Sequence, residues 1–211
     1  MPSTTSKTRR GRPKSTAKGE AILDAARDLM LEHGYSATSL EMIAEKAGVG
    51  KPTIYSRFGS KEGLFDAVVA RRSLIVEQTI GVLEVLSEDP RVDLMEITMR
   101  FQKRALAVQQ RRWDRLVIAE AARLPQLAQT LYKAGPDKFF RAITRYIRRQ
   151  SELGRLNVDT PEVAAEHLFG LLVGIELVRG QMASLPKRTA KYHQKRAEAL
   201  VDMFMAAYGV H

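Results

Sequence analysis

The stretch from Thr38 to Arg57, TSLEMIAEKAGVGKPTIYSR, constrains the fold of this 211-residue chain more than any other. It holds two short apolar patterns with helical spacing, which Gly48-Val49-Gly50 separates. Two short helices joined by a tight glycine turn can place the second helix against the edge of a DNA duplex. We therefore predict a helix-turn-helix over residues 38–57.

Turn and capping residues set the ends of the two predicted helices. The sequence Thr38-Ser39-Leu40-Glu41 is typical of a capping box, in which the threonine hydroxyl caps the helix and the glutamate reaches back. Gly48 is expected to supply the positive φ of the turn, and Gly50 the next N-cap. Pro52 falls in a first helical turn, where a missing N–H costs nothing. The second helix is therefore predicted over Lys51–Phe58.

The predicted helix Lys51–Phe58 has an inward and an outward face. The inward face is apolar, with members four residues apart: Ile54 and Phe58. The outward face offers two hydroxyls and a guanidinium: Thr53, Ser56 and Arg57. Arg57 is the expected base contact, because arginine pairs bidentately with guanine in the major groove. Phosphate contacts are expected from the residues that flank this face: Lys51 and Tyr55.

Positions on both sides of the motif are expected to bind the DNA backbone. Thr38 and Ser39 begin a helix with hydroxyls and exposed amides, which suit a phosphate; capping alone would also explain them. Gly59-Ser60 ends the motif and caps the next helix, whose first turn holds Lys61. A cation there opposes the helix macrodipole, so we predict that Lys61 meets an external phosphate.

A basic arm, residues 1–17, precedes the motif. Six Lys or Arg residues and no acid come before Glu20, and no apolar residue of the arm is able to pack, so we expect disorder. Its Arg10-Gly11-Arg12-Pro13 sequence resembles the core of the AT-hook motif, which is flat enough for a narrow minor groove. Arg10 and Arg12 are therefore candidate minor-groove contacts. The alternative is a solvated tail that adds only phosphate attraction.

Composition favours an all-α protein with a polyanionic partner. Strand patterns are scarce, and apolar residues at 45% suffice for a globular core. The net charge of +10 favours nucleic acid or an anionic membrane surface. The chain has no cysteine, which excludes disulfides and thiolate metal sites. No signal peptide is visible and charges interrupt the most apolar run, so we expect a soluble, cytoplasmic protein.

The run from Gly34 to Leu64 resembles the helix-turn-helix domain of the TetR family of transcriptional regulators. Residue type and spacing match together at Gly34-Tyr35, Thr38, Ile43-Ala44, Ala47-Gly48-Val49, Thr53-Ile54-Tyr55, Phe58, Ser60-Lys61-Glu62 and Leu64-Phe65. The resemblance covers residues 17–76 and implies DNA-facing positions at Thr38 or Ser39, Lys51, Pro52, Thr53, Tyr55, Ser56, Arg57 and Lys61. Gly50 and Ser56 depart from the family pattern, which usually has Ser and a larger side chain there. The base preference therefore does not carry over.

A larger helical domain at residues 66–211 is expected after the DNA-binding domain at residues 18–65. One helix, from Ser60 towards Leu86, is predicted to cross between them and to transmit movement. Helices are also predicted over residues 92–109, 113–122, 126–133, 137–152 and 160–184 and near the C-terminus, for about nine in all. From the stretch Arg115 to Pro136 onward, the sequence resembles TetR regulators with an AcrR/AefR-like second domain, and this domain is expected to bind the effector and to dimerise.

Two of the later helices carry apolar residues suited to an interface between two copies. The helix after Thr160 is apolar nearly all round, and its Gly170 and Gly174 would allow a close helix crossing. We predict a homodimer through a four-helix bundle, with packing inside one chain as the alternative. The predicted interface residues are Leu168, Phe169, Leu172, Ile175, Leu200, Val201 and Phe204.

The middle helices offer adaptable apolar side chains that can enclose a small molecule. The predicted ligand contacts are Met99, Trp113, Leu116, Glu120, Phe139 and His167, although plain core packing would also explain each of them. The resemblance implies an effector, which we expect to be small and largely apolar.

Enzymatic chemistry has no positive support in this sequence. The four histidines lie far apart, and no phosphate-cradling glycine loop is present, so we expect no catalytic site, metal or cofactor. The chain is instead expected to be a transcriptional regulator that binds a palindromic operator as a dimer. The resemblance implies a repressor that a small molecule releases. An architectural or ligand-independent DNA-binding protein is the alternative.

Overall fold

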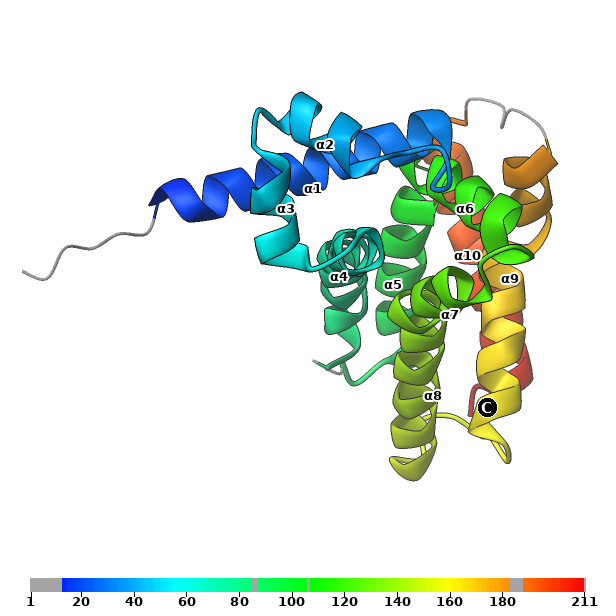
Figure 1. Ribbon diagram of the computed structural model, residues 1–211. Helices are drawn as coiled ribbons and strands as arrows, with labels where there is room; N and C mark the ends of the chain where they lie inside the picture. Colours follow the sequence, from blue (N-terminus) through cyan, green and yellow to red (C-terminus); the bar gives the residue numbers. More distant parts are fainter. Residues whose placement is uncertain (1–12, 85–86, 106, 183–187, 211) are drawn as a thin grey trace, which may run out of the picture. The chain divides into compact units, whose positions relative to one another are not determined.

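A computed structural model describes residues 13–84, 87–105, 107–182 and 188–210. These residues are helical and contain no β-strand, which confirms the all-α prediction (Figure 1). They divide into two compact units, of which the first ends at Val68 and the second begins at Val69. In chain order the elements are α1 (Pro13–His33), α2 (Leu40–Ala47), α3 (Lys51–Phe58), α4 (Lys61–Ile80), the 3-10 turn η1 (Gly81–Glu84), α5 (Pro90–Ala105), α6 (Val108–Ala121), α7 (Pro125–Ala134), α8 (Pro136–Glu152), α9 (Pro161–Met182) and α10 (Ala190–Tyr208).

The first unit packs α2 against α1 and α3 around a small core (Figure 1). Its α1 begins at Pro13, inside the arm of residues 1–17 that was expected to be disordered, so residues 13–17 are helical. Proline suits a first helical turn, and Lys and Ala extend a helix readily. Four apolar side chains of α1 with helical spacing are buried in this core: Ile22, Ala26, Leu29 and Met30.

Two glycines fix the path of the chain on either side of α3. Gly48 ends α2 with φ 63° and ψ 37°, the left-handed conformation that the sequence predicted. Gly63 has a different role, because a Cβ at this position would lie 2.1 Å from the carbonyl oxygen of Phe58. Only glycine lets the start of α4 approach the end of α3 this closely.

Helix α4 is shorter than the predicted helix from Ser60 towards Leu86. It ends at Ile80, where the 3-10 turn η1 begins with Gly81, a residue of low helix propensity. Residues of both units lie on α4. Leu64 and Phe65 are buried in the first unit, and Val76 and Ile80 belong to the apolar core of the second.

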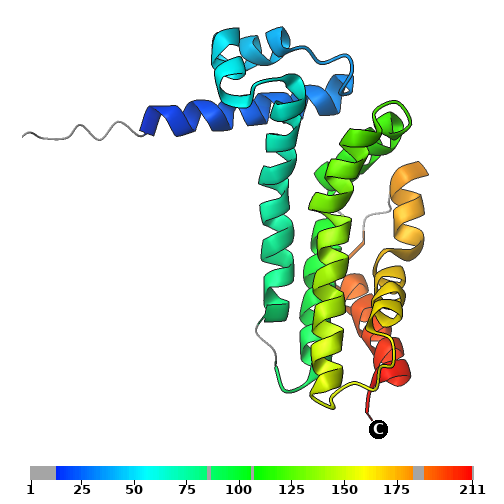
Figure 2. The same cartoon turned by 60° about the horizontal axis from the view of Figure 1, so that its bottom comes forward.

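The second unit has one apolar core, built chiefly by α5, α8, α9 and α10. Helix α8 packs against α9 and α10 against α5, while α6 packs against α7 (Figures 1 and 2). The most deeply buried side chains of the second unit include Leu94, Ile97, Ile143, Ile147, Leu168 and Phe204. Burying each such side chain stabilises the fold by roughly 1.5–3 kcal/mol.

Helix α5 ends at Ala105 and α6 runs from Val108 to Ala121, so residues 109–112 are helical and not, as predicted, a break. Helix α6 therefore begins at Val108, ahead of the predicted start at Trp113. The sequence Gln-Gln-Arg-Arg is polar, but glutamine and arginine are good helix formers, so polarity alone was a poor sign of a break.

A buried polar network joins α5 to α8. The side chain of Asp93, a residue only 4% exposed, accepts hydrogen bonds from the Tyr146 hydroxyl at 3.1 Å and from Gln150 Nε2 at 3.2 Å. The backbone N–H of Ser87 also donates to this carboxylate, at 3.1 Å. Burial, with the nearby Asp93 carboxylate, raises the pKa of the Tyr146 phenol.

Most of the predicted dimer-interface residues lie in the core of one chain. Five of them are at most 4% exposed: Leu168, Leu172, Leu200, Val201 and Phe204. Phe169 packs against the same core, and of the predicted set only Ile175 is exposed, at 57%. Six of the seven predicted interface side chains therefore pack within their own chain, and Ile175 does not.

Candidate nucleic-acid interface and ligand cavity

Helix α3 presents one exposed face on the first unit. Ile54 is fully buried, whereas Tyr55 is 48% exposed and Ser56 and Arg57 are also exposed. Pro52 lies in the first turn and is exposed as well. The two faces of α3 therefore divide as the sequence predicted, and the outer one carries the residues expected to contact DNA.

The polar side chains of this face differ in where they point. The Ser56 hydroxyl donates to the carbonyl oxygen of Thr53 at 3.1 Å, so it is turned back onto its own helix. The guanidinium of Arg57 lies against α1, where a Cβ on Gly19 would come within 3.2 Å of its Nη1 atom. Gly19 thus leaves room for an exposed arginine beside α1.

Lys51 pairs with a carboxylate of the preceding helix. Its ammonium group donates to Glu41, and the two side chains are 42% and 61% exposed. The pKa of Glu41 is lowered, chiefly by the hydrogen bond from Lys51, and that bond raises the pKa of Lys51. Lys51 also lies 5.7 Å from the centre of the Tyr55 ring. Glu41 therefore competes with any phosphate for this lysine.

Ser39 caps α2 in place of the predicted Thr38. Its hydroxyl accepts a hydrogen bond from the backbone N–H of Met42 at 3.2 Å. Thr38 is 1% exposed and donates to the carbonyl oxygen of Gly34 at 2.7 Å, so it stabilises the turn after α1. The predicted capping box was wrong by one residue. Ser39 is the more accessible of the two expected phosphate contacts.

Lys61 is held by the protein's own groups. Its ammonium group lies 4.4 Å from the centre of the Tyr35 ring and donates to the carbonyl oxygen of Ser36 at 3.2 Å. These contacts offset the unfavourable position of a cation in the first turn of α4. A phosphate contact at Lys61 stays a prediction. Arg10 and Arg12 lie outside the described residues.

A cavity of about 460 Å³ lies within the second unit. Of the six predicted ligand contacts, Trp113 and Phe139 line it, but Met99, Leu116, Glu120 and His167 do not. Met99 is 37% exposed, and the His167 ring nitrogen Nδ1 lies 2.6 Å from the Tyr208 hydroxyl, on the outside of the unit. Helix α6 turns a different side inward, through Gln110, Asp114 and Val117.

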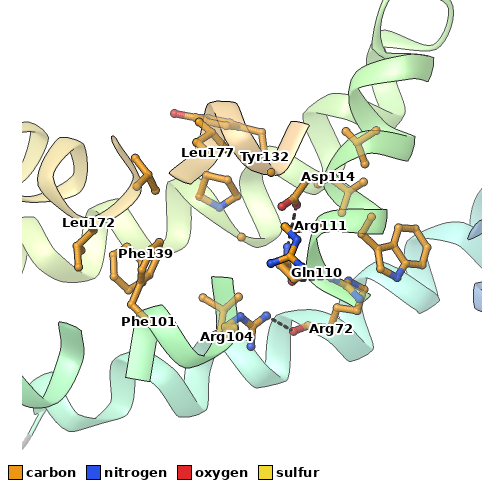
Figure 3. A pocket seen from close by; sticks show the side chains of 18 of the residues that line it. Arg72, Phe101, Arg104, Gln110, Arg111, Asp114, Tyr132, Phe139, Leu172 and Leu177 are labelled. Atoms are coloured by element: carbon orange, nitrogen blue, oxygen red, sulfur yellow. Dashed lines mark hydrogen bonds between the residues drawn. The ribbon is translucent and has the colours of Figure 1, made fainter. Parts of the chain in front are cut away.

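Apolar side chains form one side of the cavity. The rings of Phe101 and Phe139 lie 4.8 Å apart, and Phe169 lies 6.2 Å from Phe139. Leu172 and Leu177 extend this wall along α9. Figure 3 shows Phe101, Phe139 and Leu172 together on one side of the space.

Polar side chains gather on another side, and sequence reasoning missed them (Figure 3). Arg72 donates to the Gln110 side chain at 2.7 Å, and Gln110 donates to Asp114 at 2.8 Å. Arg104 donates to the carbonyl oxygen of Arg72 at 3.4 Å. Burial raises the pKa of Asp114 and lowers that of Arg104, because both charged groups are partly removed from water.

The described residues offer neither a metal site nor a membrane span. Within residues 13–84, 87–105, 107–182 and 188–210, no cluster of three or more His, Cys, Asp or Glu side chains is placed to bind a metal. None of the helices in the same ranges has the length and apolarity that a membrane span requires.

Two family models match this chain. Residues 22–68 match the model described as bacterial regulatory proteins, tetR family, and residues 93–210 match the AefR-like transcriptional repressor C-terminal domain. Among curated proteins, the HTH-type transcriptional repressor ComR of Escherichia coli (strain K12) is 50% identical over 62 residues. That match covers 29% of each of the two proteins.

Solved structures resemble the chain over most of its length. A putative TetR-family regulator from Mesorhizobium loti MAFF303099 has a TM-score of 0.83 and 30% identity, over 94% of this chain and all of that one. The flavonoid-responsive regulator FrrA has a TM-score of 0.76 and 27% identity, over 92% of this chain and 98% of its own. This protein therefore belongs to the TetR family of DNA-binding transcriptional regulators, with an AefR-like C-terminal domain.

Proposed function

We propose that this protein is a cytoplasmic, homodimeric repressor that binds a palindromic operator and leaves it when a small molecule enters the cavity. The observation that carries the proposal is the cavity of about 460 Å³. Ligand sites commonly measure about 300–1,000 Å³, whereas well-packed interiors leave few voids larger than a water molecule. The alternative, a ligand-independent DNA-binding protein, would not require such a cavity.

The exposed face of α3 supports operator reading. Each copy would set α3 into a major groove, and the two copies would read half-sites about 34–36 Å apart. Arg57 would pair with a guanine, and Lys51 and Tyr55 would contact phosphates. Ser39 and Pro52, at the starts of α2 and α3, would lie beside the DNA backbone.

An exposed apolar surface on α9 and α10 supports dimerisation. On α9, Ile175, Val178 and Met182 recur at helical spacing and are 57%, 49% and 84% exposed. On α10, Met203 is 61% exposed. A Cβ built on Gly170 would meet no neighbour within 4 Å among the described atoms, which leaves space for a close crossing with a second copy. A second copy would cover this surface by two-fold symmetry.

Helix α4 offers a route from the cavity to the reading helix. Arg72 and Val76 line the cavity, and Leu64 and Phe65 belong to the core of the DNA-binding unit. A ligand that favours one position of Arg72 and Val76 would bias the position of the same helix, and operator affinity would fall by population shift. FrrA, which this chain resembles, is a flavonoid-responsive regulator, and that supports small-molecule control.

Operator binding can be tested by selecting binding sites from random duplex DNA and then footprinting the protein on the selected sequence. We expect an inverted repeat that two copies protect together. Arg57→Ala should weaken binding by roughly 1–3 kcal/mol and relax the preference at one base pair per half-site. Selection without any enriched sequence would favour the architectural alternative. An equal loss on all sequences would make Arg57 a phosphate contact.

A further inference from the structure

The cavity is chemically divided, which restricts what can bind there. Figure 3 shows Phe101, Phe139 and Leu172 on one side and a group of charged and amide side chains on the other. The second group comes from three helices: α4 gives Arg72, α5 gives Arg104, and α6 gives Gln110, Arg111 and Asp114. A molecule that fills the space meets hydrocarbon along one part and polar groups along the other.

Two donors in the cavity wall are buried and unsatisfied. In the part of the chain that the structure describes, neither Arg104 Nη1 nor Gln102 Nε2 has a hydrogen-bond partner. Gln102 is only 3% exposed, and its side-chain oxygen is already engaged by the His193 ring nitrogen Nδ1 at 3.2 Å. A buried donor without a partner costs about 1–3 kcal/mol, and more when it is charged. A ligand acceptor would remove that penalty.

The charge balance of the cavity favours an anion. Four arginines and two acids line it: Arg72, Arg104, Arg111, Arg196, Asp114 and Glu176. Arg196 is engaged elsewhere, since it donates to the carbonyl oxygens of Leu171 and Leu172, and Glu176 accepts from Arg179 at 3.0 Å.

The remaining charged groups belong to the polar side in Figure 3. They are three guanidinium groups and the single carboxylate of Asp114, which already accepts a hydrogen bond from Gln110. Partial burial strengthens the attraction of these cations for a negative charge.

We propose that the effector is an amphipathic organic anion, such as a carboxylate on an apolar body. Its anionic oxygen accepts a hydrogen bond from Arg104 Nη1, and its hydrocarbon packs against Phe101, Phe139 and Leu172. A cation is repelled by the same arginines, and a purely apolar molecule leaves Arg104 unsatisfied. That this ligand acts as the effector rests on the proposed function, whereas the preference of the cavity for an anionic ligand does not.

Binding can be followed with matched probes and the protein's own fluorescence. Trp113 is the only tryptophan in the chain and lines the cavity, so its emission reports occupancy. The probes form two series. All compounds of the first carry a linear decyl chain, and all compounds of the second carry a cyclohexylbutyl group. Each series contains a carboxylate, a primary amide and an amine. We expect each carboxylate to bind about tenfold or more tightly than its amide, with the amine weakest.

Substitutions at Arg104 assign the preference to this residue. Arg104→Gln should abolish the preference for the carboxylate while the amide still binds, and Arg104→Lys should retain part of it. Arg100→Gln is the matched control, because Arg100 lies on the same helix but is exposed and pairs with Glu96. Thermal unfolding of each variant verifies that the fold is intact.

The outcomes separate this inference from the proposed function. The inference is overturned if neither carboxylate binds more tightly than its own amide and amine, or if Arg104→Gln keeps the preference. Operator release is measured separately with the same compounds. Release by amides alone would overturn the inference and leave the proposed function standing. Tight binding of carboxylates without release would support the inference and contradict the proposed effector response.

Discussion

The guanidinium of Arg196 donates to the carbonyl oxygen of Leu172 at 2.9 Å, at the point where helix α9 is interrupted. Gly174 has φ 37° and ψ −139°, so the helical hydrogen bonds break there and carbonyl groups of the preceding turn lose their partners. The same Nη2 atom donates to Leu171 at 3.0 Å. A cation also suits the C-terminal end of a helix segment. Arg196 thus stabilises a kink in a wall of the cavity.

Removing this contact should destabilise the second unit. We expect Arg196→Met to lower the free energy of unfolding by about 1–3 kcal/mol, because two partly buried carbonyl groups lose a charged donor. Urea unfolding measures the change. Lys195→Met on the same helix is the control, since Lys195 is exposed. Equal effects from both substitutions would show that Arg196 contributes no more than a surface charge.

Core and interface residues on α9 and α10 should respond differently to substitution. Phe204 is 1% exposed, so Phe204→Ala should lower the free energy of unfolding by about 3–5 kcal/mol. Ile175→Glu should leave the helical content unchanged and convert dimer to monomer in sedimentation. Val92→Glu is the control, because Val92 is 55% exposed on a different helix, α5. A dimeric Ile175→Glu variant would place the interface elsewhere.

The ion pair between Glu41 and Lys51 predicts a gain of DNA affinity on substitution. Glu41→Gln frees Lys51 for phosphate and removes a negative charge beside α3, so binding should become roughly two- to fivefold tighter at low salt. Fluorescence anisotropy on a labelled duplex measures it. Glu45→Gln, on the exposed side of the same helix, controls for net charge. If both variants gain equally, the pairing with Lys51 does not restrain DNA binding.

The buried carboxylate of Asp93 predicts a large loss of stability. Asp93→Ala leaves the Tyr146 hydroxyl, Gln150 Nε2 and the Ser87 N–H without their acceptor, which should cost roughly 3–5 kcal/mol. Tyr146→Phe removes one donor only and should cost about 1 kcal/mol. Thermal and urea unfolding compare the two. A loss at Asp93 no larger than that at Tyr146 would mean that water replaces the carboxylate.

The helix-turn-helix was predictable because its signals are local. Gly48 needs a positive φ, Pro52 suits a first turn, and the spacing of Ile54 and Phe58 defines one inward face. Thr38 was misassigned because threonine and serine both cap helices, and only the turn after α1 decides between them. Local rules thus place the motif and leave one-residue ambiguities at its ends.

The cavity and the proposed dimer surface depend on tertiary packing, which spacing does not encode. Trp113 and Phe139 were recognised as large apolar residues, but Arg72 and Arg104 were not, since 34 Lys and Arg residues make an arginine uninformative. An apolar stripe indicates that a helix face is buried without saying by what. Phe204 is therefore covered by its own chain, whereas Ile175 is exposed in it.

Occupancy of the cavity should release the protein from its operator, and one titration tests this directly. Ala128 lines the cavity, so Ala128→Phe should fill part of the space; Ala119→Phe, at an exposed position, is the control. A screen of apolar and amphipathic compounds against the selected operator identifies a releasing compound. We expect this compound to release the wild-type protein and the Ala119→Phe variant from the operator, but not the Ala128→Phe variant. Without the compound, all three proteins should bind the operator equally. Equal release of Ala128→Phe, or no releasing compound at all, would contradict the claim.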